Sequence, residues 1–145
     1  MFFSLFSSKN QKLVEQWSKE HKEMVILASD VISAYENEEN RYANVHNALE
    51  VLKKVSIHHL MDEDIELINM LRDTTKTSRE IDKLIVEFRE SFKGSKTAVM
   101  VFLTDYTYSD AVYDEKFINN FKHLMSVLAR RIEFEEKNLY AKLDK

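Results

Sequence analysis

The sequence predicts an all-α protein, an antiparallel up-down-up-down four-helix bundle. Four segments carry apolar residues every three or four positions, the spacing that places them on one face of an α-helix. Short polar stretches separate these segments. Among its 145 residues the chain has one glycine and no proline, so it is poor in the residues that end helices and form tight turns. Few, long helices are therefore expected.

The first helix is expected over residues 10–37 and the second from the polar turn at 36–40 to Arg72. Polar side chains interrupt both apolar stripes. The first stripe comprises Leu13, Trp17, His21, Met24, Ala28, Val31 and Tyr35. The second comprises Val45, Leu49, Leu52, Val55, His59, Glu63, Leu67 and Met70.

The third helix is expected to begin at a capping box formed by Thr77 and Glu80, with a kink at Gly94. Its stripe comprises Ile81, Leu84, Ile85, Phe88, Phe92, Val99, Phe102 and Tyr106. A loop over 107–114 precedes the fourth helix, and Asp114 is suited to its N-cap. The fourth stripe comprises Phe117, Phe121, Leu124, Leu128, Arg131, Glu135, Leu139 and Leu143.

Residues 10–145 thus predict a single bundle domain, preceded by an apolar N-terminal segment, 1–9. That segment is too short and wrongly flanked for a secretory signal, so a cytoplasmic location is expected. We expect it to pack against the bundle; contact with a partner or a membrane surface is the alternative. No apolar run reaches the ~20 residues of a transmembrane helix.

Composition also excludes several functions. The chain has no cysteine, which excludes disulfides, thiolate catalysis and iron–sulfur clusters. Its formal net charge of −4, with both signs interspersed, argues against nucleic acid as a partner. One glycine is too few for a phosphate-binding loop, and no Ser-His-Asp arrangement stands out. We therefore expect no enzymatic activity.

The polar side chains within the stripes are predicted to meet in the bundle core. Counted from the first turn, His21 lies about 17 residues back and His59 about 20 forward, so the two lie within about one helical turn of each other. The same counting places the other interruptions, and one phenylalanine of the third helix, at neighbouring heights. These residues are Glu63, Phe88, Arg131 and Glu135. Buried titratable groups are costly unless they are paired or bind a metal.

The types and spacing of these residues suit metal binding. His59 and Glu63 are four positions apart, so both point the same way from one helix. Imidazole and carboxylate ligands suit iron, manganese or zinc. Arg131 and Glu135 repeat the spacing, but a guanidinium cannot bind a metal ion and would repel one. His58 is one position from His59 and about 100° round the helix, so it is expected at the flank.

Three segments, Trp17–His21, His59–Asp64 and Arg131–Tyr140, resemble the hemerythrin HHE cation-binding family. That family is a four-helix bundle with a histidine on helix one, HxxxE pairs on helices two and four, and a histidine on helix three. It holds a non-heme di-iron centre and binds or senses oxygen or iron. The resemblance implies metal ligands at His21, His59, Glu63 and Glu135, with Arg131, His58 and Phe88 around them. This sequence has Arg131 at the helix-four histidine position, and Phe88 and Phe92 on helix three.

Two functions stay open from the sequence. One is a hemerythrin-like protein that binds or senses iron, and with it dioxygen, through an altered mononuclear or dinuclear site. The other is a metal-free bundle in which Arg131 pairs with the carboxylates and an outer face binds a partner protein. The second has its own support, because residues 128–143 resemble the regulator-of-sigma-D family of anti-sigma proteins.

Overall fold

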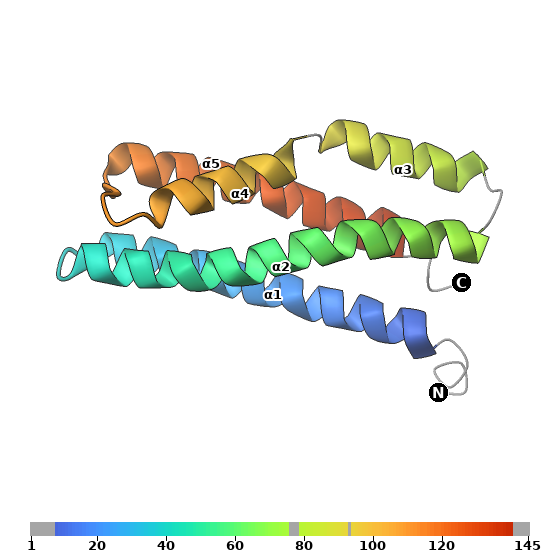
Figure 1. The fold of residues 1–145 in the computed structure, drawn as a ribbon, viewed down its shortest axis with the longest axis horizontal. Coiled ribbons are helices and arrows are strands. Elements are labelled where there is room, and N and C mark those ends of the chain that lie inside the picture. The colour runs from blue at the N-terminus through green and yellow to red at the C-terminus, as the bar shows by residue number, and fades with distance from the viewer. Residues whose placement is uncertain (1–7, 76–78, 93, 141–145) are drawn as a thin grey trace.

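The computed structural model describes residues 8–75, 79–92 and 94–140. Its helices are α1 (Ser8–Glu36), α2 (Arg41–Thr75), α3 (Arg79–Ser91), α4 (Ser95–Tyr106) and α5 (Glu115–Phe134), and α5 continues into a π-helical turn, η2 (Glu135–Leu139). They form four antiparallel rods, in which α3 and α4 follow one another as the third (Figure 1). The predicted all-α up-down-up-down bundle is therefore confirmed. Within the described ranges, no helix is long and apolar enough to cross a bilayer.

The helix boundaries lie close to those expected. α1 begins two residues before the expected Asn10, and α2 extends three residues beyond Arg72. Asn40 adopts a left-handed conformation, with φ of 54°, in the turn between them. Asparagine tolerates this conformation better than most residues, so the polar stretch can reverse the chain within a few residues.

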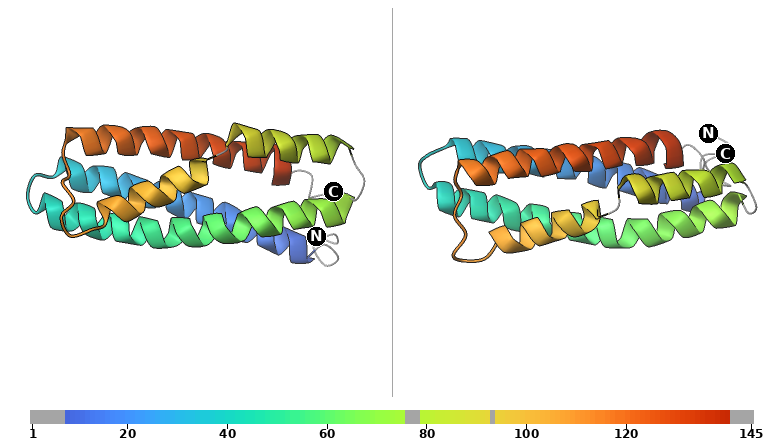
Figure 2. Two further views of the ribbon diagram at one scale, coloured as in Figure 1. Left: turned by 45° about the horizontal axis from the view of Figure 1, so that its top comes forward. Right: turned by 90° about the horizontal axis from the view of Figure 1, so that it is seen from above.

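The third rod is broken, as Gly94 predicted. Gly94 has φ of 80°, which side chains with a Cβ rarely adopt, and α4 begins at the next residue. Figure 2 shows the change of direction between α3 and α4 from two further sides. The break matters for the site, because it separates the part of the rod beside Phe88 from the part that packs further along the bundle.

The loop after α4 ends in the expected cap. The side chain of Asp114 accepts a hydrogen bond of 2.9 Å from the backbone N–H of Phe117. This satisfies one of the backbone donors left free at a helix start. The predicted capping box at Thr77 and the apolar segment 1–9 lie outside the described residues, apart from residues 8 and 9, which are helical.

Two apolar cores lie along the bundle, and a polar layer separates them. The large core is made by buried side chains near the 37–40 and 107–114 turns, and the small core by buried side chains near the opposite end. The large core comprises Met24, Val31, Val45, Leu49, Leu52, Leu60, Val99, Leu103, Tyr113, Phe117, Ile118, Phe121 and Leu128. The small core comprises Trp17, Leu67, Leu71, Ile81, Ile85, Phe88, Leu139 and Tyr140.

Candidate metal centre

The predicted polar layer exists and is deeply buried. His21, His59, Glu63 and Glu135 each have no more than 2% of their surface exposed. One potential ligand atom from each lies within 4.8 Å of the others. Three separate helical rods supply these atoms, so the fold, and not a local motif, brings the cluster together.

The outer nitrogen of each histidine is held by a carboxylate. His59 Nδ1 donates to Glu20 Oε1 at 2.6 Å, and His21 Nδ1 donates to Glu136 Oε2 at 2.8 Å. These hydrogen bonds place the proton of a neutral imidazole on Nδ1 and leave the Nε2 lone pair facing inward. Metal-binding histidines in proteins are commonly oriented in this way.

The inward-facing atoms meet one another without forming ordinary hydrogen bonds. His21 Nε2 lies 3.5 Å from Glu63 Oε2 and 3.3 Å from Glu135 Oε1, and His59 Nε2 is in contact with Glu63 Oε2. Yet neither Nε2 atom has a hydrogen-bond partner within the described part of the chain, and neither does Oε2 of Glu63 or Glu135. Buried polar atoms are nearly always satisfied, so four unsatisfied atoms at one point indicate a missing common partner.

The carboxylates of the cluster favour the uptake of positive charge. Burial disfavours a charged imidazole, but the carboxylates of Glu135 and Glu63 outweigh it and raise the pKa of His21 to about 10. The same competition raises the pKa of His59, chiefly through Glu63. Burial also favours the neutral form of Glu63, yet the two histidines lower its pKa to about 2. The carboxylates thus attract positive charge, which protons or a metal ion can supply.

Glu135 differs from Glu63 because burial dominates its environment. Burial raises the pKa of Glu135 to about 6, despite the neighbouring His21 and Arg131. Arg131 itself is 3% exposed, with Nε 3.7 Å from Glu135 Oε2 and one terminal nitrogen donating to Ser95 Oγ at 3.2 Å. Its guanidinium lies over the Phe88 ring, 5.2 Å from the centroid. Arg131 and Phe88 therefore border the cluster, where the sequence places them.

The structure places His58 away from the cluster. Its side chain is exposed on α2, at the flank that the helical pattern predicts, and does not join the buried ligands as the family resemblance implies. The reason is the helical rotation of about 100° between adjacent residues, which turns His58 outward when His59 points inward. His123 on α5 is exposed as well.

Sequence reasoning missed three members of the site. Glu20 and Glu136 are not among the residues that the sequence analysis assigns to the site, yet they hold the two histidines. The third is Tyr140, whose hydroxyl donates to Glu63 Oε1. Burial, and then the charge of Glu63, raise the pKa of Tyr140, so it stays a neutral donor. The acidic neighbours Glu20 and Glu136, each adjacent to an inward-facing position, were the available signal.

The π-helical turn explains how Tyr140 reaches the site. Over Glu135–Leu139 the helix is wider than an α-helix, and the backbone N–H of Tyr140 bonds to the carbonyl oxygen of Glu135. Such turns place one extra residue in the helix and often occur at functional sites. Here the turn lets Glu135 and Tyr140, five positions apart, face the same cluster.

A comparison with known families agrees with this geometry. The model of the hemerythrin HHE cation-binding domain matches residues 12–143, which is most of the chain. No individual curated protein and no solved structure matches at a significant level. The matched range contains every residue of the cluster and both carboxylates that hold its histidines. The chain therefore belongs to the hemerythrin HHE cation-binding family.

Proposed function

We propose that this protein binds one iron ion through His21, His59, Glu63 and Glu135, and that it binds or senses dioxygen rather than catalysing a reaction. The observation that carries the proposal is the orientation of the two histidines. Both Nδ1 atoms are tied to carboxylates, and both Nε2 atoms face two carboxylates without a hydrogen bond. Two imidazoles and two carboxylates form a donor set that suits iron, and also manganese or zinc.

One ion, not two, is supported by the residues beside the cluster. Arg131 replaces the helix-four histidine of the family pattern, and its guanidinium carries a permanent positive charge next to Glu135. The third rod contributes the Phe88 ring, which has no donor atom. A second cation would meet the charge of Arg131 and find too few ligands. We infer that the positive charge of Arg131 replaces the charge that a second metal ion would supply.

Other residues of the chain would orient the ligands, balance their charge and limit water at the site. Glu20 and Glu136 orient the imidazoles, Tyr140 donates to Glu63, and Arg131 offsets the charge of Glu135. The small core, which includes Trp17 and Phe88, gives the site an apolar border that limits water. Iron bound there would supply a redox-active centre whose oxidation state responds to dioxygen.

The metal content of the purified protein tests this proposal. We expect the full chain, purified after growth with ample iron, to carry about one iron per chain, in line with a single set of four ligands. His59→Ala should abolish binding because it removes one ligand. His58→Ala is the matched control, since it alters the exposed neighbour on the same helix, and should leave the metal content unchanged.

Two results would contradict this proposal. Well under one equivalent of any transition metal in the original chain would favour the metal-free bundle. Two irons per chain would show that Arg131 does not exclude a second ion. Exposing the reduced, iron-loaded protein to air tests the role in dioxygen chemistry, because a change in its visible absorption is expected with the original chain and with His58→Ala.

A further inference from the structure

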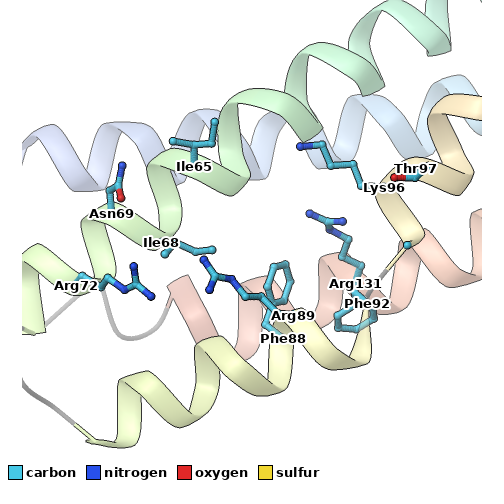
Figure 3. A pocket seen from close by; sticks show the side chains of 11 residues that line it. Ile65, Ile68, Asn69, Arg72, Phe88, Arg89, Phe92, Lys96, Thr97 and Arg131 are labelled. Carbon is cyan, nitrogen blue, oxygen red and sulfur yellow. The ribbon is translucent and has the colours of Figure 1, made fainter.

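A cavity of about 470 Å³ lies between α2 and the broken third rod, beside the polar cluster. Figure 3 shows side chains from α2, α3, α4 and α5 around it. The volume is in the range of sites that bind small molecules. The lining residues are Ile65, Ile68, Asn69, Arg72, Phe88, Arg89, Phe92, Gly94, Lys96, Thr97 and Arg131.

The charged side chains among the described lining residues of this cavity all have one sign. Four basic side chains line it, one from each of four helices, and no acidic side chain is among the described lining residues. They are Arg72, Arg89, Lys96 and Arg131. In the whole chain acidic residues outnumber basic ones, 25 to 21, so this positive cavity is opposite in charge to the protein that contains it.

The basic groups are directed toward the cavity from two sides. In Figure 3 the guanidinium groups of Arg72 and Arg89 face one another between α2 and α3, and Lys96 and Arg131 extend from the opposite side. An anion placed between the two groups would be attracted by the positive charges on both sides. The first turn of α4 also borders the cavity at Gly94 and Lys96, and no side chain caps that helix start. The dipole of the helix adds positive potential at this end.

Apolar side chains complete the wall. Ile68 and the Phe88 ring lie between the two groups of basic residues, and the Phe92 ring lies beside Arg131 (Figure 3). A bare inorganic anion would leave this apolar surface unused. An organic molecule with an anionic group would use both kinds of surface, since apolar pockets with a few placed polar groups are typical of such sites.

We propose that this cavity binds a small organic oxyanion, a carboxylate or phosphate ester with an apolar body, held by Arg72, Arg89, Lys96 and Arg131. Guanidinium groups match both types of oxyanion through paired hydrogen bonds. The site is distinct from the four metal ligands and does not require a bound metal. Arg131 belongs to the border of both, because it lines the cavity and also contacts Glu135.

Calorimetric titration of the full chain tests the proposal with four probes: phenyl phosphate, benzoate, benzyl alcohol and inorganic phosphate. We expect at least one of the two organic anions to bind, and at least about tenfold more tightly than the neutral alcohol or inorganic phosphate. Whichever organic anion binds more tightly identifies the oxyanion preferred. Equal binding of the alcohol would overturn the anionic part of the proposal, and equal binding of inorganic phosphate the organic part.

Variants and metal removal locate the binding. Arg89→Ala should weaken binding by about tenfold, as loss of a charge-assisted hydrogen bond predicts. Arg79→Ala is the matched control, because it removes the same charge from the exposed surface of the same helix, outside the cavity. Equal weakening by both variants would show non-specific attraction. Each titration is repeated after dialysis against a chelator, and loss of binding at that step would place the anion on a metal ion instead.

Discussion

The large and small cores of this bundle differ in what borders them. The large core is enclosed by all four rods and contains a group of packed aromatic rings, in which Phe117 contacts Tyr35, Phe102, Tyr106, Tyr113 and Phe121. The small core borders the polar cluster on one side and, through Phe88, the cationic cavity. The large core therefore stabilises the packing of the helices, whereas the proposed metal site and the proposed anion site lie at the border of the small core.

A substitution that damages the large core alone tests whether the two ends of the bundle are independent. Phe117 is fully buried, so Phe117→Ala should lower the free energy of unfolding by about 3–5 kcal/mol through lost burial and a residual cavity. Urea unfolding measures the change. Metal content per folded chain should not change, because no ligand touches Phe117. Loss of metal in the folded variant would show that the two ends are not independent.

A second substitution, of a residue beside the cluster, leaves the large core unchanged. Glu20→Gln keeps an acceptor oxygen near His59 but removes its charge, so metal affinity should fall about 10- to 100-fold. Competition with a coloured chelator measures the affinity. Glu23→Gln changes an exposed glutamate on the same helix and should have no effect. Similar losses in both variants would mean that net charge, and not the contact with His59, sets the affinity.

The raised pKa of His21 makes metal affinity depend on pH. With a pKa near 10, against 6.5 ordinarily, His21 in the metal-free protein holds a proton at neutral pH that a metal ion must displace. Affinity should therefore rise about tenfold per pH unit between pH 7 and 9, and fall more steeply below pH 6, where Glu135 also takes up a proton. Affinity measured in buffers across this range, at constant ionic strength, provides the test. A flat profile would contradict the charge balance described for the cluster.

The same proton has an effect on the metal-free fold with a defined sign. Because the folded-state pKa of His21 is the raised one, its stabilisation is complete below pH 6.5 and is lost as pH rises toward 10. Metal-free protein should thus unfold at lower urea concentration at pH 9 than at pH 6.5. In metal-loaded protein the ion replaces the proton, and this loss should be smaller.

The smallest expected effect lies at the turn beside the large core. Asp114→Ala removes the N-cap of α5 and should lower the free energy of unfolding by about 1 kcal/mol. Asp110→Ala, at an exposed position of the same loop, is the control. Thermal unfolding measures both. Metal affinity should be unchanged, and a change would indicate that the cap positions the far end of α5.

The sequence was sufficient for the bundle because long stripes with helical spacing are its strongest type of signal. It also placed His21, His59, Glu63 and Glu135 in one layer, since counting from turns gives height along antiparallel rods. It could not assign Glu20 and Glu136, because exposed and half-buried glutamates look alike in a helical pattern. Nor could it find Tyr140, because an α-helical period places a residue five positions after Glu135 off the inward face.

The wider turn at Glu135–Leu139 has a consequence for how this chain tolerates changes in length. Removing a single residue there, such as the exposed Lys137, would restore ordinary winding and leave Glu135 and Tyr140 four positions apart, about 40° around the axis. The phenol would therefore still face Glu63, as it does across the wider turn. Regular α-helical winding of the full-length segment would instead turn Tyr140 about 140° from Glu135, and Glu63 would lose its phenol donor.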